Sequence, residues 1–212
     1  MSIDTSTLSI LTFNYRLDIW LALYSLVMHA VDVLPSSLMF RVTLKLPKYV
    51  PYGLHNEYIS QFMESFCRYY ERKDIEFFYK WVKEFSYKSR AGNFHYHIWM
   101  ITDGREVRNP FSFRWKAIEV WGRQIGTPAD GLVNIDRLDI PGSYTPHGIM
   151  VRKRAQDYDY LMWNVWDRLQ YLAKAYSKDY YPYNGDAYGG TQVPLRSLNE
   201  ALEKLIEIMP GR

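Results

Sequence analysis

The chain has 212 residues, of which 48% are hydrophobic and 17% aromatic, enough to bury the core of one domain. Its formal net charge of +3 permits an anionic partner without requiring one. The single cysteine, Cys67, excludes an internal disulfide and argues against a cysteine-type zinc module. We therefore expect a core cysteine and a reducing, cytoplasmic setting.

An apolar stretch, IWLALYSLVMHAV, covers residues 19–31 and is too short to span a bilayer. Asp18, His29 and Asp32 lie in or beside it, and it lacks the basic start and small-residue cleavage site of a secretory signal. We therefore expect an amphipathic helix and no membrane partner. Residues 1–38 are predicted to form a helical arm packed on the domain that follows.

The pattern of apolar residues predicts the elements after this arm. Strands are expected at 40–46, 76–85, 94–102 and 131–138, and helices at 57–72, 111–124, 157–178 and 197–209. A polar turn at 86–93 joins the second and third strands into a hairpin. Ser197 and Glu200 are predicted to form a capping box at the start of the last helix.

This order of elements predicts an α+β domain at residues 39–180, with a central, largely antiparallel sheet and helices on one face. A Tyr- and Gly-rich loop and a C-terminal helix would occupy residues 181–212. The length fits one domain, and the absence of repeats and low-complexity tracts in the sequence argues against disorder.

The third predicted strand contains the segment FHYHIWM, residues 94–100. Because successive strand side chains point to opposite faces, the two histidines share one face with Trp99. The other face carries an apolar set that should pack against helices, namely Phe94, Tyr96, Ile98 and Met100. A ligand could therefore approach the sheet from the side of His95 and His97.

Two imidazoles two residues apart on a strand have Cα atoms roughly 6 to 7 Å apart and can converge on one divalent cation. The simpler alternative is a pair of sheet-surface histidines bonded to neighbours or water. A carboxylate as third ligand would suit Mg²⁺ or Mn²⁺, and the hairpin would bring Glu84 back beside His95. Glu76 and Asp103 are the competing carboxylates.

The helix predicted at 157–178 carries the segment YLAK, residues 171–174. Tyr171 and Lys174 lie nearly opposite its apolar stripe, so a phenol and an ammonium group share its polar face. In a chain with 19 tyrosines, this pair alone is typical of a solvated helix face. A phenol, with a reference pKa of about 10, becomes a competent nucleophile when its deprotonation is assisted and a metal polarises the electrophile. Together with a metal site, the pair therefore indicates phosphoryl transfer.

HYHIWM, residues 95–100, resembles the histidine-hydrophobic-histidine motif of the HUH endonucleases, which include rolling-circle replication initiators, relaxases and related transposases. YLAK resembles their tyrosine nucleophile motif, and MFRVTLKLP, residues 39–47, resembles their first-motif strand. In order and spacing, WVKEF…HYHIWM, GLVNI and LQYLAKAYSK are similar to the inovirus replication-protein-like family (YagK/YfjJ C-terminal domain) of filamentous phages and enterobacterial prophages. The resemblance covers about residues 39–178 and implies an HUH, RRM-like fold with the catalytic tyrosine on a late helix.

The resemblance implies metal-dependent nicking and joining of single-stranded DNA at the replication origin of a phage, prophage or plasmid in a bacterial cytoplasm. His95, His97 and Glu84 would hold Mg²⁺ or Mn²⁺. Tyr171 would attack the scissile phosphate, leaving a 5′-phosphotyrosine and a free 3′-hydroxyl, and Lys174 would orient the reactants or balance charge. The alternative is a catalytically inactive DNA-binding regulator on the same fold.

Two features depart from the family pattern. The strand after the histidines continues into ITDGRE, with Asp103 where an Asn-containing turn is expected, and no P-loop follows, so unwinding would depend on a host helicase. Candidate DNA contacts are the basic or polar residues Arg41, Thr43, Lys45, Lys88 and Arg90 for phosphates, and Trp99 or the tyrosines of residues 180–188 for unpaired bases.

Overall fold

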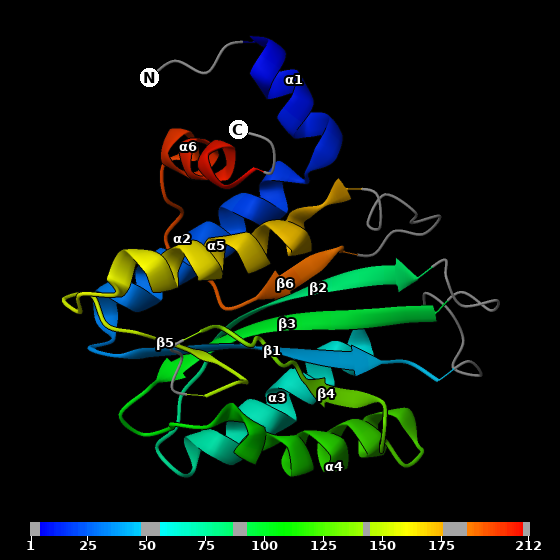
Figure 1. The fold of residues 1–212 in the computed structure, drawn as a ribbon. Helices are drawn as coiled ribbons and strands as arrows, with labels where there is room; N and C mark the ends of the chain where they lie inside the picture. Colours follow the sequence, from blue (N-terminus) through cyan, green and yellow to red (C-terminus); the bar gives the residue numbers. More distant parts are fainter. Residues whose placement is uncertain (1–4, 48–55, 87–92, 142–144, 176–185, 210–212) are drawn as a thin grey trace.

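The computed structural model describes residues 5–47, 56–86, 93–141, 145–175 and 186–209 (Figure 1). In chain order the elements are α1 (Thr5–Asn14), α2 (Leu17–Val33), β1 (Ser37–Lys45), α3 (Glu57–Glu71), β2 (Phe78–Ser86), β3 (Asn93–Asp103), a 3₁₀ turn (Pro110–Phe113), α4 (Arg114–Ile125), β4 (Val133–Ile135), β5 (Ile149–Val151), α5 (Tyr158–Ala173), β6 (Tyr188–Gly190) and α6 (Leu198–Ile208). Every predicted strand and helix is present, although several boundaries differ. β5 and β6 were not predicted, because three-residue strands are too short to leave a periodic pattern.

The strands form one six-stranded antiparallel sheet, in the order β4-β1-β3-β2-β6, which confirms the predicted α+β class. β5 pairs with the start of β1, on the side of β1 where β4 pairs further along. β2 and β3 form the predicted hairpin, and β3 lies between β1 and β2. The strand that carries both histidines is therefore central in the sheet.

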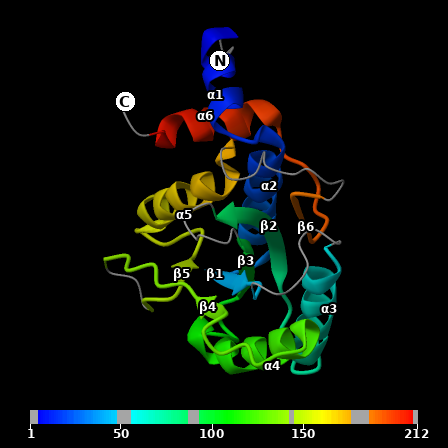
Figure 2. The ribbon, with the colours of Figure 1, turned by 90° about the vertical axis from the view of Figure 1, so that its right-hand side faces the viewer.

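Helices cover both faces of this sheet (Figure 1, Figure 2). α3 and α4 pack on the apolar face of β3, as the strand pattern predicts. α2 and α5 pack on the opposite face, with α6 against them. The prediction of helices on one face only was wrong, because the second face also carries apolar side chains. Met39, Trp99 and Ile101 lie on it and form a core with α2 and α5.

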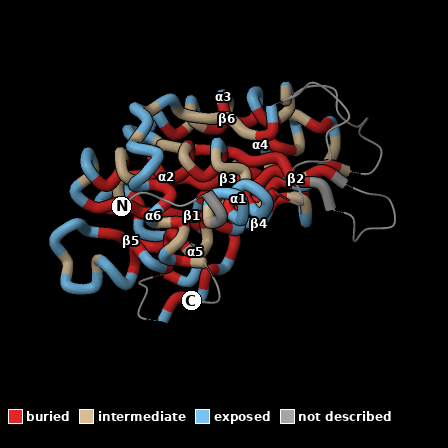
Figure 3. Tube along the Cα trace, turned by 90° about the horizontal axis from the view of Figure 1, so that it is seen from above, coloured by how far each residue is buried: buried red, intermediate tan, exposed pale blue. Residues whose placement is uncertain are grey.

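Burial follows this arrangement and concentrates along β1, β2 and β3 in the middle of the molecule (Figure 3). Trp99 is 0% exposed, and its indole N–H has no hydrogen-bond partner among the described residues. The prediction that Trp99 stacks on DNA bases was therefore wrong.

The apolar stretch at 19–31 is part of α2, as predicted. Within the described ranges, none of the helices combines the length and hydrophobicity that a membrane crossing requires.

α5 ends at Ala173, before the predicted end at residue 178. The backbone N–H of Arg16 donates to the carbonyl oxygen of Ala173 at 2.7 Å, and Tyr15 forms an isolated bridge with Lys174. The segment between α1 and α2 thus replaces the next turn of the helix, and Lys174 becomes its C-cap. At α6 the predicted capping box was wrong, since the Ser197 side chain makes no cap hydrogen bond.

Gly190 allows β6 to pair closely with β2. Its φ is +138°, and a Cβ at this position would lie 2.3 Å from the carbonyl oxygen of Tyr79. Gly190→Ala is expected to lower the free energy of unfolding by roughly 2 to 6 kcal/mol, through backbone strain and overpacking. Urea denaturation measures this change. Gly126→Ala is the control, because Gly126 has a φ of +69° but a Cβ there would meet nothing within 4 Å. Equal losses in the two variants would contradict the packing argument.

Cys67, on α3, is partly buried against the core between α3 and α4. Burial raises the pKa of its thiol to about 12, and the nearby Glu71 adds to the increase. Because the thiolate is the reactive form, iodoacetamide is expected to modify native Cys67 roughly a hundred to a thousand times more slowly at pH 8 than it modifies the urea-unfolded chain. Mass spectrometry of timed samples measures both rates, and similar rates would show that the thiol is not shielded.

Candidate metal centre

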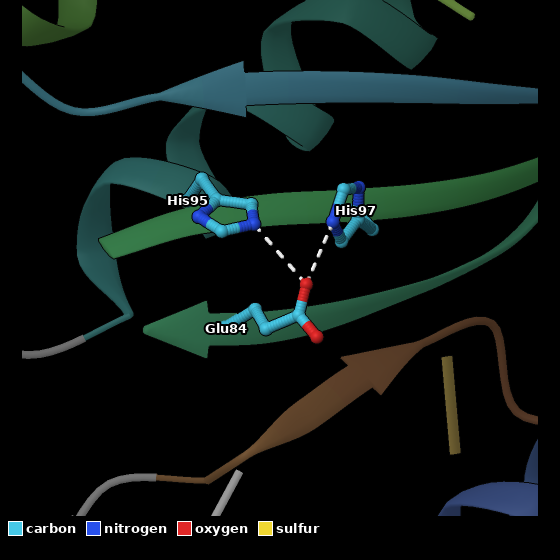
Figure 4. A group of neighbouring side chains, drawn as sticks. All are labelled: Glu84, His95 and His97. Carbon is cyan, nitrogen blue, oxygen red and sulfur yellow. Dashed lines mark hydrogen bonds and ion pairs between the residues drawn. The ribbon is translucent and has the colours of Figure 1, made fainter. Parts of the chain in front are cut away.

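The hairpin brings Glu84, His95 and His97 together on one face of the sheet (Figure 4). Glu84 lies near the end of β2 and pairs in register with His95, and His97 follows two residues later on the same face of β3. His95 Nε2 lies 3.1 Å from Glu84 Oε2, and His97 Nε2 lies 2.8 Å from the same oxygen. One ligand atom from each residue can be chosen so that all three lie within 4.8 Å of one another.

The cluster is closed on one side and open on the other. The side chains of Glu84 and His97 are 5% and 11% exposed, whereas that of His95 is 19% exposed. Burial lowers the pKa of His97, and this effect outweighs the opposing hydrogen bond to Glu84. Burial thus favours the neutral imidazole, which is the form that binds metals. A ligand would reach the cluster most readily from the side of His95.

The distances within the cluster suit a cation. Both Nε2 atoms approach one carboxylate oxygen. Each imidazole could donate its own Nε2–H to this oxygen, and a divalent cation could instead accept lone pairs from both nitrogens and from the oxygen. The three residues are close enough to bind a metal ion, which agrees with the metal ligands that the sequence predicts. Two imidazoles and a carboxylate form a donor set suited to a divalent metal.

The competing carboxylates lie at the other end of the hairpin. Asp103 pairs with Ser37 at the end of β3, and its carboxylate accepts hydrogen bonds from Arg105. Glu76 precedes β2, and its carbonyl oxygen accepts a hydrogen bond from Thr102. Among the described residues, Glu84 is the carboxylate that joins the histidines.

A polar network contacts His97 at Nδ1, the ring nitrogen that does not face Glu84. The Thr43 Oγ1 atom lies 2.9 Å from His97 Nδ1, and the Thr43 hydroxyl is 3.1 Å and 3.2 Å from the two carboxylate oxygens of Asp136. Asp136 also forms an ion pair with Arg41 and accepts a hydrogen bond from Asn134 at 2.7 Å. Sequence reasoning missed Asp136, because its contact with Thr43 depends on the pairing of β4 with β1.

This network changes the interpretation of the first strand. Thr43 is 7% exposed, and Arg41 is half-buried in its pair with Asp136. The prediction that Arg41 and Thr43 track DNA phosphates was therefore wrong, because both side chains are engaged inside the protein. Lys45 is exposed at the end of β1 and pairs in register with His95, so it remains available to a phosphate. Lys88, Arg90 and residues 180–185 lie outside the described residues.

Tyr171 and Lys174 form a second group, at the C-terminal end of α5. The Tyr171 side of the helix faces outward, as the helical pattern predicts, and the residue is 39% exposed. The Lys174 ammonium lies 5.2 Å from the centre of the Tyr171 ring, so the two side chains are neighbours. α5 packs through Leu169 and Leu172 into the core that also contains Val82, the register partner of His97. α5, which bears Tyr171, therefore packs on the same face of the sheet as Glu84, His95 and His97.

Comparisons with protein-family models, with curated proteins and with solved structures found no match. The HUH resemblance therefore rests on the sequence motifs alone.

Proposed function

We propose that this chain is a metal-dependent, single-tyrosine endonuclease of the HUH type, which nicks and rejoins single-stranded DNA at a replication origin of a phage, prophage or plasmid. The observation that carries the proposal is the convergence of His95, His97 and Glu84 on one point, since two of these residues come from the histidine motif. The packing of α5, which bears Tyr171 next to Lys174, on the same face of the sheet supports it.

In this proposal His95, His97 and Glu84 would hold Mg²⁺ or Mn²⁺, which would polarise a phosphodiester and neutralise its charge when bound. The substrate enters from the His95 side, where the cluster is most exposed. Lys45, exposed at the end of β1, is positioned on this face to attract the DNA backbone. A protein that binds DNA through few cations should do so weakly and with a modest salt dependence.

The proposed chemical step is a transesterification. The Tyr171 oxygen attacks phosphorus, a P–O bond to the phenolic oxygen forms, and the P–O3′ bond breaks. The phenolic proton is lost to solvent, and the departing 3′-oxygen gains one, so protons and charge balance. Lys174, next to the phenol, stabilises its negative form and the phosphate oxygens. Attack by the freed 3′-hydroxyl on the phosphotyrosine reverses the step and joins the strand.

A pool of labelled single-stranded oligonucleotides with a randomised centre tests the proposal without knowledge of the nick site. We expect a covalent protein–DNA adduct on a denaturing gel in Mn²⁺ and none in excess EDTA. DNA binding without an adduct would contradict the nuclease and favour the inactive regulator. Failure to bind either DNA or Mn²⁺ would overturn both.

A further inference from the structure

We infer that Asp136, acting through Thr43, is a positioning residue that fixes the tautomer of His97 and directs the Nε2 lone pair toward Glu84. This inference deepens the proposed function, because it concerns the metal site on which that function rests. Asp136 lies outside the segments that carry the family resemblance, and Thr43 lies in the strand at residues 39–47 but in neither the histidine motif nor the tyrosine motif. The carbonyl oxygen of Arg41 also accepts the backbone N–H of Asp136 at 2.9 Å, which ties the end of β4 to β1.

The first step concerns the hydroxyl hydrogen of Thr43. Asp136 is paired with the Arg41 guanidinium and accepts from Asn134, and an ionised carboxylate can only accept hydrogen bonds. Both of its oxygens lie within 3.2 Å of the Thr43 hydroxyl. The single hydroxyl hydrogen is therefore directed to Asp136.

The second step concerns His97. Since the Thr43 hydroxyl has given its hydrogen to Asp136, its oxygen can only accept at the 2.9 Å contact with His97 Nδ1. Nδ1 must then carry a hydrogen, and in a neutral ring Nε2 carries none. The Nε2 lone pair faces Glu84 Oε2 at 2.8 Å, so two acceptors meet at a point that a cation would occupy. Metal-bound histidines commonly donate their other N–H to an outer partner in this way.

The two histidines differ in this respect. His95 contacts Glu84 through Nε2, and its Nδ1 has no hydrogen bond within the part of the chain that the structure describes. No hydrogen bond at Nδ1 therefore fixes the ring orientation of His95, whereas the contact with Thr43 fixes that of His97. His97 is the preorganised ligand and His95 the adjustable one, which agrees with the greater exposure of His95.

The cost of burying this network also suggests a functional role. The side chains of Arg41 and Asp136 are 22% and 10% exposed, and Thr43 is 7% exposed. A partly buried ion pair is weak as a source of stability, because desolvation offsets much of its attraction. Here the Arg41–Asp136 pair lies next to the Thr43 hydroxyl that contacts His97. It can therefore orient the His97 ring, which an apolar pair of the same size could not do.

Thr43→Val and Asp136→Asn test the inference through Mn²⁺ affinity, measured by electron paramagnetic resonance without DNA. Both variants are expected to weaken binding roughly 10- to 100-fold, whereas Thr43→Ser should restore affinity to within about threefold of wild type. Thr102→Val is the matched control, because it removes another buried threonine hydroxyl, bonded to the Glu76 carbonyl at the far end of β3. It should leave Mn²⁺ affinity unchanged.

A second readout does not depend on metal. Nitrogen–proton correlation spectra of the imidazole rings distinguish the two neutral tautomers, and a His97→Gln variant assigns the signals among only five histidines. We expect the Nδ1–H tautomer for His97 in wild type and in Thr43→Ser, and a mixture in Thr43→Val. Mixed tautomers in wild type, or an unchanged Mn²⁺ affinity in Thr43→Val, would overturn the inference. A wild-type protein that shows these effects but makes no DNA adduct would contradict the nuclease and leave the positioning role standing.

Discussion

Tyr171→Phe is expected to lower the rate of covalent adduct formation by at least about a thousandfold, while DNA binding and Mn²⁺ affinity stay close to wild type. Phenylalanine keeps the ring and removes only the oxygen that the proposal makes the nucleophile. Because Tyr171 is 39% exposed, the substitution should change the free energy of unfolding by less than about 0.5 kcal/mol. The loss can therefore be attributed to chemistry rather than to folding. Timed samples on a denaturing gel measure the rate.

Tyr160→Phe is the matched control for this experiment. Tyr160 lies on the same helix and is 48% exposed, but it is near the opposite end of α5 from Lys174. Its hydroxyl contacts the carbonyl oxygen of Pro141 at 3.5 Å, a weak hydrogen bond whose loss should be minor. Adduct formation should persist in this variant. Persistence of the adduct in Tyr171→Phe as well would assign the nucleophile to another residue and contradict the proposal.

The second large effect is expected from the metal ligands. The double variant His95→Ala/His97→Ala should weaken Mn²⁺ binding by more than about 100-fold, because it removes two of the three proposed ligands. It should also abolish the adduct. Glu84→Gln is a smaller change that preserves side-chain size and should also weaken binding. Titration calorimetry measures the affinities, and circular dichroism verifies that each variant is folded.

His147→Ala is the control for the histidine variants. Its ring lies 4.7 Å from that of Phe111, its Nδ1 is 3.1 Å from the carbonyl oxygen of Ile135, and it is not part of the cluster of Glu84, His95 and His97. Mn²⁺ affinity should be unchanged in this variant. If the double variant retained wild-type affinity, the metal would have to bind elsewhere, and the cluster would be a hydrogen-bonded group without a cation.

The sequence predicted the cluster of Glu84, His95 and His97 because its geometry is local. The alternation of β3 places His95 and His97 on one face, and a hairpin fixes which residue of the preceding strand lies beside them. The hairpin therefore placed Glu84 beside His95 without knowledge of the rest of the fold, although Glu76 and Asp103 remained competing carboxylates. The register Glu84↔His95 confirms this reasoning.

The parts that the sequence could not predict depend on segments distant in the chain. Asp136 reaches Thr43 only because β4 pairs with β1 across a long connection. α5 stops at Ala173 because the backbone near Arg16 occupies the position of the next turn. Trp99 is buried because α2 and α5 pack over its end of the sheet. Periodicity within one element carries no signal for any of these contacts.

The proposed nuclease function requires that Tyr171 becomes covalently bonded to DNA. After incubation with the randomised single-stranded pool and Mn²⁺, nuclease and trypsin digestion followed by tandem mass spectrometry localises the remaining nucleotide. Cleavage after Arg168 and Lys174 yields the peptide LQYLAK, in which Tyr171 is the only tyrosine, while Tyr176 falls on the next peptide. The expected result is a nucleotide bound through its 5′-phosphate to Tyr171 in LQYLAK. A modified peptide elsewhere, or no modified peptide from protein that binds both DNA and Mn²⁺, would contradict it.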